Sequence, residues 1–93
     1  MNKNFHSLLI TDQDDVAVAL ANLTKDTKVQ VKKGQKLLKI TLLDDIPIYH
    51  KFSIRLLQSG ENLLKYGEVI GRASQDIPLG SYVHTHNLES KRG

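Results

Sequence analysis

The chain has 93 residues, a formal net charge of +3 and no cysteine. This length fits one small domain with a thin core, which a partner chain, a partner domain or a homo-oligomer would extend. The absence of cysteine excludes disulfides, thiolate metal sites and thiol nucleophiles. No apolar run approaches the roughly 20 residues that cross a bilayer, and the N-terminus lacks the apolar core of a signal peptide, so we expect a cytoplasmic protein and no membrane partner.

The first part of the chain predicts a strand and then one short helix. Residues 1–7 are polar and are expected to be a loose start, and the apolar run Leu8–Ile10 is expected to form a short strand. Asp12 and Asp15 have the spacing of a capping box. The apolar side chains that follow recur with the spacing of one helical face, namely Val16, Ala19, Leu20 and Leu23. We therefore expect a helix near residues 14–22.

From Lys25 onward the pattern changes to the two-residue period of strands. Apolar and polar residues alternate on both sides of Lys33-Gly34-Gln35, which predicts a hairpin of residues 27–31 and 36–43. The lysines of this segment carry no interleaved aromatic residue or arginine. They are therefore interpreted as the solvated face of the hairpin, and no nucleic-acid partner is expected.

A turn motif occurs twice. Asp45-Ile46-Pro47 leads into the strand candidate Tyr49–Leu56, and Asp76-Ile77-Pro78 leads into a second β-type run that starts at Tyr82. Proline disfavours helical backbone in the residue before it and removes a ladder donor, so each motif predicts a chain reversal or a sheet edge. The duplication suggests two related β units folded against each other, with chance similarity of a common turn as the alternative.

Glycines separate the remaining elements. Gly67 predicts a tight turn after Tyr66, and Gly71 predicts a bend or a close approach of two backbones. Residues 88–93 are expected to be a loose tail or the start of a linker. With six or so short strands, one helix and frequent turns, residues 1–93 are predicted to be a single, mainly β domain.

Three of the four histidines follow the duplicated turns. His84 and His86 are two residues apart, so in a strand both imidazoles would leave the same face. Such a pair could bind a divalent metal or an anion, but two histidines do not complete a site and no acidic residue is an obvious third ligand. On residue types alone, histidines in this arrangement are more often surface or hydrogen-bonded residues.

Four further residues are candidates for a site. His50 and Lys51 would point to opposite faces of a strand, and a lysine can anchor a carboxylate as a point charge. Tyr66 could place a phenol at a pocket, and Asn87 offers a hydrogen-bonding amide. The simpler interpretations are a solvated lysine and a half-buried tyrosine. A Gly-rich phosphate loop and a nucleophile elbow are both absent from the sequence.

The order of these motifs resembles a known family. The chain reads Asp-Ile-Pro-x-x-His-Lys-Phe, then Leu-Leu-Lys-Tyr-Gly-Glu-Val-Ile-Gly, then Asp-Ile-Pro-x-Gly-x-x-Val-His-Thr-His-Asn-Leu. This succession resembles the N-terminal SAF domain of the altronate and galactarate dehydratase family, in whose group the sulfolactate sulfo-lyase small subunit belongs. The resemblance covers roughly residues 8–89.

The resemblance implies a β-clip fold and a role in a hydroxy-acid lyase, a carbon–oxygen hydro-lyase of the altronate or galactarate type. It implies a large catalytic chain or domain as partner, a sugar acid or sulfolactate as substrate, and iron or manganese as cofactor. Met1 and the end at Gly93 favour a separate subunit, which is expected to be inactive alone. The alternatives are a sulfolactate sulfo-lyase small subunit, a purely structural β-clip module, and a binding domain of another kind.

Within this resemblance the candidate residues take roles. His84, His86 and His50 would be catalytic, and His84 and His86 would also be metal ligands. Lys51, Tyr66 and Asn87 would bind substrate. We expect His84 and His86 to project from the same side of the final strand, with His50 and Tyr66 approaching the same groove.

Overall fold

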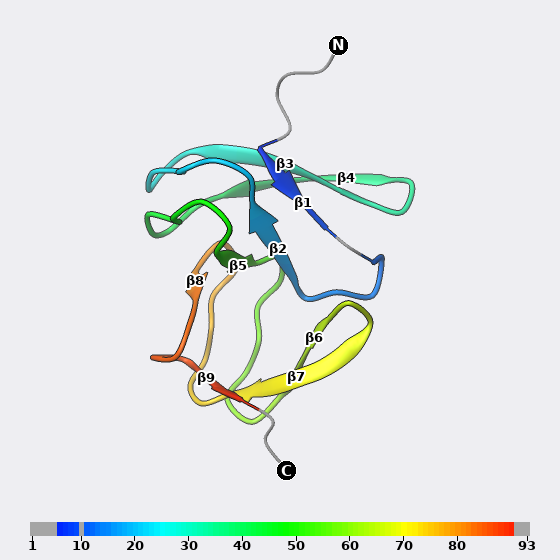
Figure 1. The fold of residues 1–93 in the computed structure, drawn as a ribbon, viewed down its shortest axis with the longest axis vertical. Coiled ribbons are helices and arrows are strands. Elements are labelled where there is room, and N and C mark those ends of the chain that lie inside the picture. The colour runs from blue at the N-terminus through cyan, green and yellow to red at the C-terminus, as the bar shows by residue number, and fades with distance from the viewer. Residues whose placement is uncertain (1–5, 10, 91–93) are drawn as a thin grey trace.

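The structure is a computed structural model, which describes residues 6–9 and 11–90 (Figure 1). The described residues form nine strands: β1 (Ser7–Leu8), β2 (Val16–Ala19), β3 (Lys28–Lys33), β4 (Lys36–Thr41), β5 (Lys51–Ser53), β6 (Asn62–Lys65), β7 (Glu68–Ala73), β8 (Tyr82–Val83) and β9 (Leu88–Ser90). A mainly β domain is thereby confirmed. No helix suited to crossing a membrane occurs in this part of the chain.

The strands form three antiparallel sheets that are stacked along the long axis of the molecule. A central sheet has the order β1-β2-β5-β8, the β3–β4 hairpin lies on one side of it, and the sheet β6-β7-β9 lies on the other (Figure 1). One apolar cluster, which includes Phe52, Ile40 and Leu42, joins the central sheet to β3–β4. A second cluster, which includes Val83, Leu63 and Ile77, joins it to β6–β7. The thin core is thus divided between the two faces of one small sheet.

The predicted helix near residues 14–22 is wrong, because this segment contains strand β2. Val16 and Ala17 are both buried although they point to opposite faces, since Val16 packs in the second apolar cluster and Ala17 in the first. A short apolar run that is buried on both faces shows no period that separates strand from helix. The backbone of β2 pairs with β1 on one side and with β5 on the other.

Asp12 and Asp15, which were expected to cap a helix, instead bond to other elements of the fold, as does Asp14 between them. Oδ1 of Asp12 accepts a hydrogen bond from the Gly34 amide at 2.9 Å, and Oδ1 of Asp14 accepts one from the Gly67 amide at 2.9 Å. Asp15 accepts hydrogen bonds from the Leu64 amide and from Nε of Arg55. Asp12, Asp14 and Asp15 therefore link both outer sheets to the segment that leads into β2 of the central sheet.

The duplicated turns belong to a larger repeat of the backbone. Ile46 pairs with Leu23 and Ile77 pairs with Leu57 as isolated antiparallel bridges. Each of these four residues is followed by a four-residue turn. In that turn the third residue has a positive φ, and the fourth residue donates its amide to the carbonyl of the first. The positive-φ residues are Asp26 (73°), Tyr49 (71°), Gly60 (90°) and Gly80 (86°). The structure therefore supports two related β units, each with its own hairpin.

The hairpin predictions are confirmed within a few residues. Strands β3 and β4 flank the turn at Gly34, and Tyr66 and Gly67 form the turn between β6 and β7. Gly71 is the predicted close approach, because a Cβ there would lie 2.3 Å from the carbonyl oxygen of Glu89. Two described parts of the segments that were expected to be loose form strands: Ser7 belongs to β1, and residues 88–90 form β9. Residues 1–5, Ile10 and residues 91–93 lie outside the described residues.

Candidate functional site

Three histidines and one tyrosine gather at the β8 edge of the central sheet. The Tyr82 hydroxyl lies 2.7 Å from Nδ1 of His50, in a hydrogen bond. The Tyr82 ring is stacked on His84, with centroids 5.4 Å apart and planes 6° apart, and lies 5.9 Å from His86. His50 and His84 are 5.5 Å apart. Below, His50, Tyr82, His84 and His86 are called the imidazole cluster.

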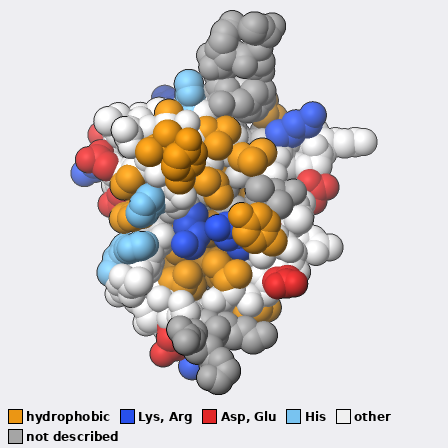
Figure 2. Space-filling model, in the orientation of Figure 1, with side chains coloured by type: hydrophobic (Ala, Val, Ile, Leu, Met, Phe, Trp, Pro, Cys, Tyr) orange, Lys and Arg blue, Asp and Glu red, His pale blue; other side chains and the backbone are white. Residues whose placement is uncertain are grey.

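The cluster is open to solvent on one face. His84 and His86 are exposed, whereas His50 and Tyr82 are half-buried. In Figure 2 histidine side chains lie to one side of a group of Lys and Arg side chains, and hydrophobic side chains border that group above and below. The imidazoles therefore stand where a ligand or another polypeptide can reach them.

The predicted strand placement of His84 and His86 is wrong, because residues 84–87 form a turn. The carbonyl of His84 accepts hydrogen bonds from the amides of Asn87 and Leu88. The Asn87 side chain closes the turn: its Oδ1 accepts from the His84 amide at 3.0 Å, and its Nδ2 donates to the Tyr82 carbonyl at 2.9 Å. A side-chain amide that satisfies nearby backbone groups competes with strand pairing.

Asn87 therefore positions the histidines in this structure. Asn87 is only 4% exposed, and both ends of its side-chain amide form hydrogen bonds within the chain. The substrate contact assigned to it from the sequence stays a prediction.

Tyr82 is the member of the cluster that sequence reasoning missed. It was assigned only as the start of a strand, yet it contacts all three histidines. The Tyr82 amide donates to Oδ2 of Asp44 at 3.0 Å, which fixes this end of β8. Two features of the sequence could have pointed to Tyr82. It lies two residues before His84, and the run that it starts would pair with the strand after His50 if the two turn units pack against each other.

Lys51 and Tyr66 are placed differently from each other. Lys51 lies on the central strand β5, and its side chain is partly buried. Burial, and then the charge of Lys65, lower the pKa of the Lys51 ammonium from its ordinary value. Tyr66 is 58% exposed at the β6–β7 turn, where Nζ of Lys65 lies 4.8 Å from its ring centroid. Tyr66 makes no ring contact or hydrogen bond with the histidines in the described part of the chain.

The cluster supplies the right donor types for a transition metal but too few of them. Imidazole nitrogens suit zinc, iron, nickel and copper. However, residues 6–9 and 11–90 contain no group of three His, Cys, Asp or Glu side chains that could hold a metal ion. Any metal at this edge would need ligands from elsewhere, so the metal role of His84 and His86 stays a prediction.

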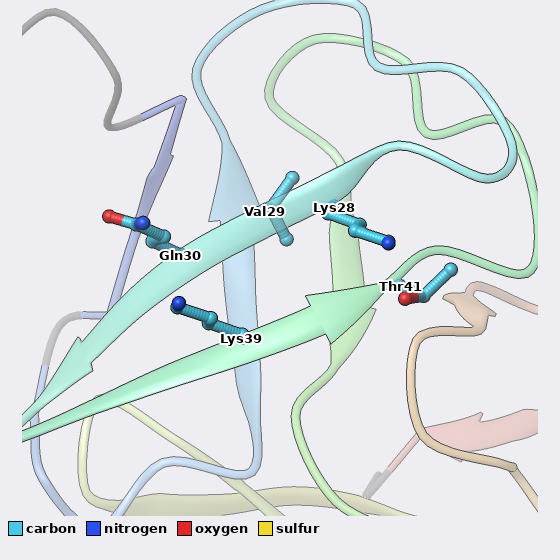
Figure 3. A pocket seen from close by; sticks show the side chains of 5 residues that line it. All are labelled: Lys28, Val29, Gln30, Lys39 and Thr41. Atoms are coloured by element: carbon cyan, nitrogen blue, oxygen red, sulfur yellow. The ribbon is translucent and has the colours of Figure 1, made fainter.

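A separate hollow of about 240 Å³ lies on the β3–β4 hairpin (Figure 3). It is lined by Lys28, Val29, Gln30, Lys39 and Thr41. Lys28 pairs across the hairpin with Thr41, and Gln30 pairs with Lys39. None of these residues belongs to the imidazole cluster, and the exposed lysines agree with the solvated face expected from the sequence.

Comparison with known proteins identifies the family. A family model described as the altronate/galactarate dehydratase SAF domain matches residues 5–91. The chain belongs to this family. Altronate dehydratase from Escherichia coli strain K12 is 43% identical over 77 residues, which are 83% of this chain and 15% of that protein.

Two further relatives are matched over a larger share of their own length. The alpha subunit of (2R)-sulfolactate sulfo-lyase from Paracoccus pantotrophus is 43% identical over 54 residues, 58% of this chain and 81% of that subunit. The corresponding subunit from Chromohalobacter salexigens is 44% identical over 62 residues, 67% of this chain and 66% of that subunit. This SAF domain thus spans 15% to 16% of the length of the altronate dehydratases it matches.

Proposed function

We propose that this SAF domain is part of a hydroxy-acid lyase, a sugar-acid dehydratase of the altronate or galactarate type. It brings the imidazole cluster to an active site that a larger catalytic part completes. The observation that carries the proposal is the convergence of His50, His84 and His86 around Tyr82 at an exposed edge. The dehydratases and sulfo-lyase subunits among the relatives support the class of reaction.

The chemistry asks for groups that imidazoles provide. Dehydration removes a proton from the carbon next to the carboxylate, and the freed electron pair forms the double bond as the neighbouring hydroxyl leaves. A base must hold the first proton, and an acid must give one to the hydroxyl so that it leaves as water. Imidazole titrates near neutral pH and can do either. His84 and His86, as the exposed members, are proposed for these two roles.

The other residues of the site would then hold the imidazoles and the substrate in position. The hydroxyl of Tyr82 holds the His50 ring through Nδ1 and leaves Nε2 free for substrate. Asn87 keeps the turn that carries both exposed imidazoles. Lys51 is proposed to attract the substrate carboxylate, and Tyr66 to border the same groove.

A divalent metal, iron or manganese by family resemblance, would supply positive charge beside the substrate carboxylate. His84 and His86 would hold it together with ligands from the larger catalytic part, because the described residues offer too few. In that case the base and acid roles pass to His50 and to residues of the larger part.

The need for a larger part follows from the openness of the site. Lyase intermediates need protection from water, and His84 and His86 are exposed in the described part of the chain. Apolar side chains lie close by: Ile48 and Tyr49, which directly precede His50, are 36% and 73% exposed. Leu20, 43% exposed, follows Ala19, whose carbonyl accepts a hydrogen bond from the Tyr49 amide. Such a surface suits contact with the catalytic part, whether that is a separate chain or the remainder of the same chain.

Two alternatives are tested together with the main proposal. In a sulfolactate sulfo-lyase the same acid–base groups would act, but sulfite would leave in place of water. In a purely structural module the histidines would not affect turnover. The larger part should be identified by co-purification, and the assembled protein should be assayed on altronate, galactarate and sulfolactate.

The deciding variant is His84→Ala/His86→Ala. Both side chains are exposed, so the free energy of unfolding should change by no more than about 0.5 kcal/mol per site. Turnover of the assembled enzyme should fall by at least about 10²-fold, the lower end of acid–base contributions. His6→Ala, which removes an exposed histidine outside the cluster, is the matched control and should leave turnover unchanged. A double variant that melts far lower but keeps full turnover per folded molecule would mean that the histidines are structural.

A further inference from the structure

The hollow on the β3–β4 hairpin is surrounded by side chains that can donate hydrogen bonds. Lys28, Gln30, Lys39 and Thr41 line it together with Val29 (Figure 3). We propose that this hollow binds a compact dianion, such as phosphate or a short dicarboxylate. The inference is independent of the proposed function, because the hollow includes no residue of the imidazole cluster.

The register of the hairpin places the four polar side chains on one face. Lys28 pairs with Thr41, and Gln30 pairs with Lys39. Side chains that are paired across two strands, or that lie two residues apart on one strand, share a face. The side chain of Val29 points the other way, into the apolar cluster beneath the hairpin. Lys28 and Lys39 are therefore diagonal neighbours, about 7–8 Å apart at the backbone, so their long side chains can reach one anion.

All four side chains have donors that are not engaged within the described part of the chain. A lysine ammonium only donates hydrogen bonds, and the glutamine amide and threonine hydroxyl can also donate. Among the described residues, Gln30 takes part in a side-chain hydrogen bond only through its backbone carbonyl, which accepts from the Ser7 hydroxyl. By contrast, Nζ of Lys33, on the inner side of the same hairpin, donates to the Asp14 carbonyl at 3.1 Å. The hollow thus presents a set of donors to solvent.

No acid of the described residues compensates the two ammonium groups. The ion pairs of this part of the chain involve neither Lys28 nor Lys39. Asp44 and Asp45, which follow β4, accept hydrogen bonds from backbone amides of other segments. Asp26, two residues before Lys28, is exposed and forms no ion pair with it. A bound anion would gain charge-assisted hydrogen bonds from both lysines without displacing a carboxylate of the chain.

The volume of the hollow limits the size of the ligand. It measures about 240 Å³. This is roughly the volume that eight water molecules occupy in the liquid, and it lies below the range of about 300–1,000 Å³ that is typical of pockets for drug-sized ligands. Phosphate or a short dicarboxylate such as malonate suits this space, whereas a nucleotide is too large to be enclosed.

The test is a titration of the 93-residue chain with phosphate and, separately, with malonate. It is carried out at neutral pH and at an ionic strength held constant with sodium chloride, and backbone amide NMR signals report binding. We expect saturable shifts of the signals of β3 and β4, with a Kd of about 1–10 mM, because a few exposed charge-assisted contacts bind weakly.

The variant Lys28→Gln/Lys39→Gln should weaken binding by at least about 5-fold, because one exposed ion pair is worth up to about that factor and two are removed. The matched control is Lys32→Gln/Lys36→Gln. It removes the same charge from two exposed lysines of the same hairpin that do not line the hollow. The control should weaken binding by less than about 2-fold. All four substituted side chains are exposed, so both variants should melt within about 3 °C of the wild type.

The two anions distinguish the chemistry of the ligand. Tighter binding of phosphate indicates a phosphate group, tighter binding of malonate indicates carboxylates, and equal affinity indicates a site for compact dianions in general; each result supports the proposal. The proposal is overturned if neither anion gives a saturable shift up to about 50 mM, or if the shifts lie outside β3 and β4. An equal loss of affinity in the two double variants also overturns it, because the anions would then respond only to the net charge of the chain.

Discussion

Replacing Tyr82 with phenylalanine removes one hydroxyl and leaves the aromatic ring in place. The lost interaction is the 2.7 Å hydrogen bond to Nδ1 of His50, whereas the stacking on His84 and the contact with His86 need only the ring. Tyr82 is half-buried, so the cost should lie in the lower part of the usual range for one hydrogen bond, about 0.5–1 kcal/mol. In a domain of this size, that lowers the melting temperature by about 2–8 °C.

The more informative measurement is the state of the His50 ring. If the phenol donates to Nδ1, neutral His50 carries its proton on Nε2, since the partner of one ring nitrogen decides the tautomer. Nitrogen NMR of the imidazoles at pH 8 should therefore show a shift of the His50 Nδ1 signal in Tyr82→Phe, as the ring loses its fixed tautomer. Turnover of the assembled enzyme should fall by about 10-fold, the equivalent of about 1.4 kcal/mol of lost positioning.

Tyr66→Phe is the matched control, because the described residues form no hydrogen bond with the Tyr66 hydroxyl, and it should leave the His50 signals unchanged. Tyr82→Leu removes the ring as well and should cost a further 0.5–1.5 kcal/mol or so through lost aromatic contacts. The reasoning is refuted if the His50 signals of Tyr82→Phe match those of the wild type while the protein is folded.

Two further predictions concern stability. Asp14 is fully buried and accepts hydrogen bonds from the amide and hydroxyl of Thr11 and from the Gly67 amide. Asp14→Ala should therefore lower the free energy of unfolding, measured with urea, by about 3 kcal/mol. Asp12 is exposed and accepts one such bond, so Asp12→Ala should lower it by about 1 kcal/mol. Burial raises the pKa of Asp14, but these hydrogen bonds outweigh it and hold the pKa below the usual 3.8. The contribution is therefore complete above that pH and is lost as the pH falls through the folded-state pKa; a cost that stays constant into strong acid would contradict this. Tyr49 has φ 71° and is 73% exposed at a position where two equivalent turns have glycine. Tyr49→Gly should relieve about 1–2 kcal/mol of backbone strain and cost about 0.5–1 kcal/mol of chain entropy, so the melting temperature should rise by a few degrees. A lower melting temperature would show that the Tyr49 ring stabilises the fold.

The sequence by itself determined the class of fold and the location of most turns. Gly34 and Gly67 mark hairpin tips because both have positive φ, and Gly71 marks a close approach because no side chain fits against Glu89. These are local requirements of the backbone, and a residue type reports them directly. The order of the motifs around His50 and His84 also led to the family that the comparison identified.

Only the tertiary structure decided what the apolar segment after Asp15 becomes and how the histidines meet. Val16 to Ala19 satisfies a helical spacing, yet two apolar clusters and two neighbouring strands make it a strand, and no local signal carries that information. The imidazole cluster likewise depends on the pairing of β5 with β8, which brings Tyr82 to His50 from 32 residues away. The Asn87 amide turns the chain after Val83, so the two exposed imidazoles are arranged by a side-chain cap in place of a strand period.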